Sequence, residues 1–262
     1  MRVIAAAETD AGICKPVNQD GYCIKIAQTP AGQIALAVVC DGMGGLEKGE
    51  LASATVVRAF SAWFDQTLPE LLPELLPELD WMRISEMWRD MIRAADEQLH
   101  AYGAAHGLEL GTTVTAMLVY GGKYLIAHVG DTRVYEVSGV LRQLTEDHTV
   151  VAREVQAGLL TPEAAELDPR RNVLLQCVGA SERMQPDIFG GDLDAGACYL
   201  LCSDGLRHVV QPQELREYTR PDRMQSEQTI RTSLRYLIDL AKYRAEQDNI
   251  TALLLRVQEQ DA

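Results

Sequence analysis

The chain has 262 residues, 47% of them hydrophobic, and a formal net charge of −14 at pH 7. This length and hydrophobic content are typical of one large folded domain and exclude a disordered chain. The negative charge would repel nucleic acid and anionic membranes, so we expect neither as a partner.

The apolar stretch near the N-terminus has only a few residues, whereas a secretory signal needs roughly 7–15. No stretch approaches the roughly 18 consecutive apolar residues of a membrane-spanning helix. We therefore expect a cytoplasmic protein. Its six cysteines are then expected to be free thiols, because disulfides are rare in that compartment.

The first third of the chain predicts strands followed by a helix. Two apolar runs, 21–28 and 33–41, flank the turn signal TPAG and predict a β-hairpin. The hairpin leads into DGMGG, a glycine-rich loop that begins at Asp41. Apolar residues at helical spacing then predict a helix over 47–68.

Three copies of the tetrapeptide LPEL follow this helix. Proline at every fourth residue cannot continue a regular helix, so the repeats predict a surface excursion of short turns. We interpret them as a tolerated loop insertion. The alternative is a partner-binding segment.

The rest of the chain alternates between blocks of strands and blocks of helices. Such blocks predict an α+β fold with antiparallel sheets in a single domain, residues 1–262. Three strands in succession predict an antiparallel meander. The expected elements are a helix over 80–106, strands over 112–120, 123–131 and 132–138, short helices within 149–179, a strand over 198–204, a helix over 225–245 and a strand over 249–257.

Aspartates stand beside the ends of several hydrophobic runs: Asp20, Asp41, Asp131, Asp204 and Asp248. One aspartate at a strand end is ordinarily a turn residue. Several carboxylates buried together cost several kcal/mol unless cations neutralise them. Oxygen ligands select hard ions such as Mg²⁺ or Mn²⁺, and two such ions can clamp a phosphate. The glycines after Asp41 would let a main-chain carbonyl approach a metal ion closely.

These runs resemble the motifs of the metal-dependent protein phosphatases, the type 2C serine/threonine family, in its short bacterial single-domain form. The resemblance extends nearly end to end and in order. It is carried by TDAGICKPVNQD, VCDGMGG, GELAS, GTT, VGDTR, LTEDHT, PRRNVLLQCVG, LLCSDGL and DNIT. It implies a four-layer α-β-β-α sandwich, two antiparallel sheets flanked by pairs of helices, with a flap at about 149–180.

The resemblance also implies the roles of the acids. Asp41 would bridge two ions, either Mn²⁺ or Mg²⁺. The Gly42 carbonyl and water held by Asp20 would complete the coordination of one ion. Asp204 and Asp248 would complete that of the other.

By the same resemblance, Asp131 and Asp204 would hold a weaker third ion. The reaction would be in-line attack on phosphorus by a hydroxide that bridges the first two ions. The enzyme would hydrolyse phosphoserine and phosphothreonine in proteins.

Lys15 stands where the family usually has an arginine that contacts the substrate phosphate. Lysine supplies positive charge but no bidentate fork, so we expect weaker substrate capture. Met43 and Leu46 stand where many eukaryotic and many bacterial members carry a histidine. His148 matches a family residue, for which a structural role is expected and direct catalysis is the alternative. The remaining histidines are expected to be structural: His100, His106, His128 and His208.

The implied enzyme would be a monomer that opposes a bacterial serine/threonine kinase. One alternative is an inactive phosphatase that binds phosphoproteins without turnover. The retained acids argue against it, and only the replaced arginine favours it. Another alternative is a scaffold that uses the LPEL repeats, whose binding would survive metal removal.

Overall fold

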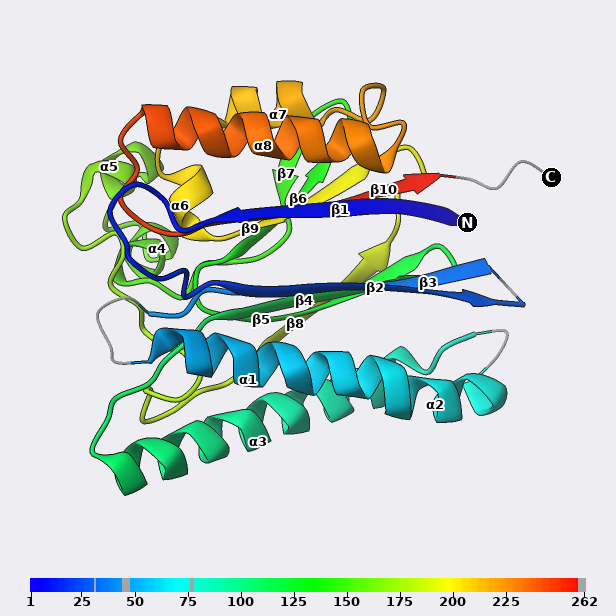
Figure 1. Ribbon diagram of the computed structural model, residues 1–262, viewed down its shortest axis with the longest axis horizontal. Coiled ribbons are helices and arrows are strands. Elements are labelled where there is room, and N and C mark those ends of the chain that lie inside the picture. Colours follow the sequence, from blue (N-terminus) through cyan, green and yellow to red (C-terminus); the bar gives the residue numbers. More distant parts are fainter. Residues whose placement is uncertain (31, 44–47, 76–77, 259–262) are drawn as a thin grey trace.

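The computed structural model describes residues 1–30, 32–43, 48–75 and 78–258. Two five-stranded antiparallel sheets lie face to face, and helices cover both outer surfaces (Figure 1). One sheet has the strand order β1-β10-β9-β6-β7, and the other has the order β2-β3-β4-β5-β8. The expected four-layer sandwich is confirmed.

The bounds of the elements agree with most of the expected ranges. In chain order they are β1 (Arg2–Asp10), β2 (Gly21–Thr29), β3 (Gly32–Cys40), α1 (Gly49–Ala62), the π-helical turn Trp63–Thr67, α2 (Leu68–Leu75), α3 (Trp81–His106), β4 (Val114–Tyr120), β5 (Lys123–Val129), β6 (Arg133–Val137), β7 (Leu141–Gln143), α4 (Val150–Gln156), α5 (Pro162–Leu167), β8 (Asp187–Asp192), β9 (Cys198–Cys202), α6 (Asp204–Arg207), α7 (Pro212–Thr219), α8 (Glu227–Tyr243) and β10 (Ile250–Gln258). Helices α1 to α3 cover one sheet, and α7 and α8 cover the other (Figure 1).

Strand β3 is apolar along nearly its whole length because both of its faces are buried. Ile34, Leu36 and Val38 pack against the layer of α1 and α3. The residues between them pack against the other sheet. Each fully buried aliphatic side chain of this size contributes roughly 1.5–3 kcal/mol. The strand is therefore a rigid support for the loop that follows it.

The first two LPEL repeats, residues 68–75, are helical, so the prediction of short turns is wrong for them. Helix α1 passes through a π-helical turn directly into α2, which spans LPELLPEL. Pro69, which lacks an N–H, falls where the π-helical turn meets α2. Leu68 and Leu71 are buried in the core beneath α1 to α3. This burial outweighs the low helix propensity of proline. Residues 76–77 of the repeats lie outside the described residues.

The predicted three-stranded meander is wrong in its third strand. Strands β4 and β5 pair as expected, but β6 pairs with β7 and β9 in the opposite sheet. The chain crosses between the sheets at Gly130, which has a φ of +112°. A Cβ on Gly130 would lie 2.6 Å from Cβ of Thr113, so glycine is required at this crossing. Asp131 immediately follows it.

No helix in the described ranges is both long enough and apolar enough to cross a membrane.

Candidate metal-binding active site

The β2–β3 hairpin places Asp20 beside Asp41. Gly21 pairs with Cys40 in the register of the two strands, so the flanking aspartates leave the sheet at the same edge. Thr113 fixes the backbone of Asp41 from both sides. The Asp41 N–H donates to Thr113 Oγ1 at 2.8 Å, and the Thr113 N–H donates to the Asp41 carbonyl at 2.9 Å.

The opposite sheet brings Asp204 and Asp248 to this edge. Strand β9 ends and β10 begins here, because the two strands are antiparallel neighbours. Ser203 joins the two sheets, since its hydroxyl donates to Asp20 Oδ2 at 2.9 Å. Carboxylates that are far apart in the sequence therefore converge at one edge of the sandwich.

These carboxylates interact strongly. Removal from water raises the pKa of Asp41 well above its usual value, and the charges of neighbouring carboxylates raise it further: Asp20, Asp204, Asp131 and Asp248. Removal from water also raises the pKa of Asp20 to about 7. Hydrogen bonds from Thr251 and Ser203 oppose that rise, whereas Asp204 and Asp248 add to it.

The chemistry of this edge fits divalent cations. Asp20 Oδ1 and Asp204 Oδ1 are buried and accept no hydrogen bond within the described part of the chain. Unsatisfied buried oxygens and mutual repulsion both cost free energy, and a hard cation with oxygen ligands relieves both. No three His, Cys, Asp or Glu side chains in the described ranges are close enough to form a complete ligand set as they stand.

Basic side chains lie close to the carboxylates at the periphery of this edge. The pairs are Lys15 Nζ with Asp248 Oδ1 at 3.3 Å, Arg207 Nη2 with Asp131 Oδ2 at 2.9 Å, and His208 Nε2 with Asp204 Oδ2 at 3.4 Å. Neither Asp20 nor Asp41 has an ion-pair partner among the residues that the structure describes. Within the described ranges, these two central acids therefore have no basic side chain to offset a negative charge.

Gly42 is enclosed by backbone. A Cβ at this position would contact the Gly49 carbonyl oxygen and would lie 2.5 Å from the Gln19 carbonyl oxygen. Only glycine fits here, as the sequence predicts, although the direct reason is packing against the start of α1. Residues 44–47, which include Leu46, lie outside the described residues.

Two residues that support the acids of this edge, His208 and Asn249, were not identified as functional from the sequence. His208, expected to be structural only, lies between Asp204 and Glu246, whose Oε2 is 3.7 Å from His208 Nδ1. Glu246 Oε1 in turn accepts the backbone N–H of Asp248 at 3.0 Å. The four-residue spacing from Asp204 to His208, which places both on one helix face, could have revealed this contact.

Asn249 is the second of these residues. Its side chain accepts the Gln19 N–H at 2.8 Å and donates to the Ala11 and Val17 carbonyls at 3.0 and 3.2 Å. It therefore holds the loop that carries Lys15 and Asp20.

His148 supports the crossover that precedes Asp131. Its Nδ1 accepts the Gly130 N–H at 3.1 Å, and its Nε2 lies 3.1 Å from Asp187 Oδ2. Arg170, between α5 and β8, is paired with Glu154 and Asp168.

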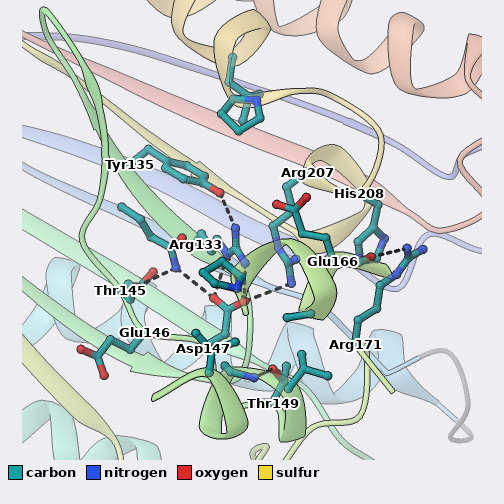
Figure 2. A pocket seen from close by; sticks show the side chains of 18 of the residues that line it. Arg133, Tyr135, Thr145, Glu146, Asp147, Thr149, Glu166, Arg171, Arg207 and His208 are labelled. Carbon is teal, nitrogen blue, oxygen red and sulfur yellow. Dashed lines mark hydrogen bonds and ion pairs between the residues drawn. The ribbon is translucent and has the colours of Figure 1, made fainter. Parts of the chain in front are cut away.

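A cavity of about 470 Å³ lies next to the carboxylate edge. Its walls come from β6, β7, the helices α4 and α5, and the segment from α6 to α7. Figure 2 shows a charged network on one wall, in which Asp147 lies between Arg133 and Arg207. Arg207 and His208 line this cavity and also contact acids of the edge.

Comparisons with known proteins agree with this geometry. A family model described as protein phosphatase 2C matches residues 15–254. The chain is 33% identical over 223 residues to a protein named serine/threonine phosphatase stp from Listeria monocytogenes, and the match covers 84% of this chain and 83% of that protein.

Solved structures are similar over nearly the whole chain. The serine/threonine phosphatase Stp1 from Staphylococcus aureus has a TM-score of 0.83 and 29% identity, covering 99% of this chain and 96% of that one. The catalytic domain of the phosphatase PstP, solved in complex with 2 manganese ions, has a TM-score of 0.78 and 29% identity. The match covers 98% of this chain and 99% of that one.

Proposed function

Because the chain belongs to the protein phosphatase 2C family and is a serine/threonine protein phosphatase, we propose that its carboxylate edge is the catalytic centre. The enzyme depends on divalent metal ions, as its family does. The observation that supports this location is the convergence of Asp20, Asp41, Asp204 and Asp248, with two buried carboxylate oxygens left without hydrogen bonds.

Two ions would share Asp41, the central acid. The Gly42 carbonyl and water held by Asp20 would serve one ion, and Asp204 and Asp248 the other. Bound Mn²⁺ or Mg²⁺ supplies positive charge to the phosphate and lowers the pKa of water, so that water can attack phosphorus.

The protein's own groups orient the reacting parts. Ser203 holds the Asp20 carboxylate, and Asn249 holds the loop on which Lys15 stands. Lys15 would donate to the substrate phosphate, for which its ammonium must leave Asp248. A metal ion that binds Asp248 would repel the Lys15 ammonium, and this repulsion would release Lys15 to the phosphate.

The substrates are phosphorylated proteins, and we propose that a serine/threonine kinase produces them. We assign residues 1–262 to a single catalytic domain with a flap at about 149–180. A monomer is supported because one chain supplies every acid of the site. A cytoplasmic location is supported by six free cysteines, which are typical of a reducing compartment.

The test is hydrolysis of a phosphothreonine peptide with Mn²⁺, with EDTA, and by the variants Asp41→Asn and Asp204→Asn. We expect turnover only in wild type with Mn²⁺. Full metal-dependent activity of Asp41→Asn would refute the proposed role of Asp41. A folded wild type that binds Mn²⁺ but turns over no substrate would instead favour the inactive phosphatase. Binding of a partner that survives EDTA would favour the scaffold.

A further inference from the structure

Asp131 already has a positive partner within the protein. Arg207, the last residue of α6, donates from Nη2 to Asp131 Oδ2 at 2.9 Å and to the Asp131 carbonyl at 3.3 Å. Asp131 is only 4% exposed. The two groups therefore face each other with little water between them, where the attraction between opposite charges is strong.

The same nitrogen of Arg207 also faces a second acid, Asp147. Its Nη2 lies 3.6 Å from Asp147 Oδ2, and Asp147 is bound by Arg133, whose Nε and Nη2 donate to its two oxygens at 2.7–3.1 Å (Figure 2). Arg133 in addition donates to the Tyr135 hydroxyl at 2.9 Å. Two carboxylates, those of Asp131 and Asp147, therefore hold the Arg207 guanidinium at this position.

The position of Arg207 follows from α6. This helix begins at Asp204, and Arg207 is three residues later, so one helical turn carries both an acid and the cation for a second acid. Burial raises the pKa of Asp131 to about 7, and the charge of the nearby Asp204 adds to this rise, whereas the charge of Arg207 opposes it. Arg207 therefore acts where these two acids meet.

We propose that Arg207 supplies the counter-charge of Asp131, so that Asp131 and Asp204 do not hold a third metal ion in this protein. The inference rests on the proposed function, which places the other ions at Asp41. A further cation beside Asp131 would meet this guanidinium in a poorly solvated site, and Oδ2 is already engaged. Arg207 is a positioning residue, since it acts through Asp131 and Asp147.

The inference is tested by the number of Mn²⁺ ions bound per chain, measured by equilibrium dialysis with metal analysis and by the electron paramagnetic resonance of free Mn²⁺. Four proteins form a cycle: wild type, Arg207→Met, Asp131→Asn and the double variant. We expect Asp131→Asn to bind as many ions as wild type. Arg207→Met should gain about one ion, and the double variant should lose that gain.

Arg133→Met is the matched control. It removes the other arginine from Asp147 but leaves the contact of Arg207 with Asp131, so it should bind as many ions as wild type. Arg207→Lys keeps the charge and should also gain none. If Arg207→Met fails to fold, Arg207→Gln replaces it in the cycle. Glutamine is also neutral, but it retains a hydrogen-bond donor at this position.

The outcomes separate the two proposals. This inference would be overturned if Asp131→Asn bound one Mn²⁺ ion fewer per chain than wild type. It would also be overturned if a folded Arg207→Met or Arg207→Gln bound no more ions than wild type. A wild type that binds no Mn²⁺ would overturn the proposed function and this inference with it.

Discussion

Lys15 Nζ lies 3.3 Å from Asp248 Oδ1, so the side chain proposed to contact the substrate phosphate is paired with a proposed metal ligand. The β1–β2 loop carries the lysine, and the loop between α8 and β10 carries the aspartate. Metal binding and phosphate binding are therefore linked at one ion pair. The pair also connects the residue that departs from the family pattern with one that follows it.

Replacement of Lys15 should change substrate capture. We expect Lys15→Met to lower kcat/KM by about 10- to 100-fold, since a hydrogen bond to a charged group contributes about 1.5–3 kcal/mol. Lys15→Arg should lower KM, because a guanidinium can bind phosphate through two donors. Lys25→Met is the control, since Lys25 is equally exposed and also paired with an aspartate, Asp65. An unchanged KM in both Lys15 variants would contradict this role.

Gly42→Ala should disrupt the site through packing. The added Cβ would collide with two backbone carbonyl oxygens that cannot move independently of α1 and the Asp20 loop. We expect a loss of about 1–3 kcal/mol in the free energy of unfolding, together with weaker Mn²⁺ binding. Gly139→Ala, where nothing lies within 4 Å of the new Cβ, is the control. Denaturant unfolding of both variants without metal measures the difference, and equal stabilities would refute the packing argument.

The effect of pH on Mn²⁺ stabilisation should reveal the central acids. The folded-state pKa of Asp20 is about 7 and that of Asp41 is raised well above its usual value, both first through removal from water. A raised acid pKa means that folding favours the protonated form, so this stabilisation is lost as pH rises through the folded pKa. The metal-free protein should therefore lose stability between pH 6.5 and 8.

Mn²⁺ competes with these protons, so the rise in Tm that it causes should be larger at pH 8 than at pH 6.5. Asp131, whose pKa burial raises to about 7, changes charge in the same window, whereas His128, whose pKa burial lowers to about 4, changes charge only below it. Thermal unfolding with EDTA and with saturating Mn²⁺ at both pH values provides the test. A rise that is equal at both would exclude proton competition at the site.

His208 should support metal binding through Asp204 and Glu246. Loss of a residue that orients a metal ligand typically lowers metal affinity by about 10- to 100-fold. We expect His208→Leu to need about tenfold more Mn²⁺ for half-maximal activity, with kcat at saturating Mn²⁺ close to that of wild type. His106→Leu, at the exposed end of α3, is the control. A metal requirement that is unchanged would leave His208 with a packing role only.

The sequence predicted the elements whose signals are local. The hairpin of β2 and β3 follows from two apolar runs around TPAG, and α3 follows from its periodic stripe. The acids at strand ends were identified because each strand ends in a turn with a small residue beside the aspartate. Whether they converge could be inferred only through the resemblance, because strand order is not encoded locally.

The errors concern interactions between distant segments. The first two LPEL repeats are helical because Leu68 and Leu71 reach a core built by other elements. Strand β6 does not join the sheet of β4 and β5, because Gly130 turns the chain toward β9 in the other sheet. Arg207 gave no signal in the sequence, since its two acids, Asp131 and Asp147, come from the turn after β5 and the loop before α4.

The order of strands has a consequence for the time course of folding. Asp20 and Asp41 leave one sheet, while Asp204 and Asp248 leave the other, and the first and last strands of the chain, β1 and β10, are neighbours. Such long-range pairings form slowly, because a large loop must close before any contact stabilises it. Metal binding and catalytic turnover therefore require both sheets and both ends of the chain. In a refolding experiment, phosphatase activity should return last, after secondary structure and compaction, and a chain that lacks β10 should recover none.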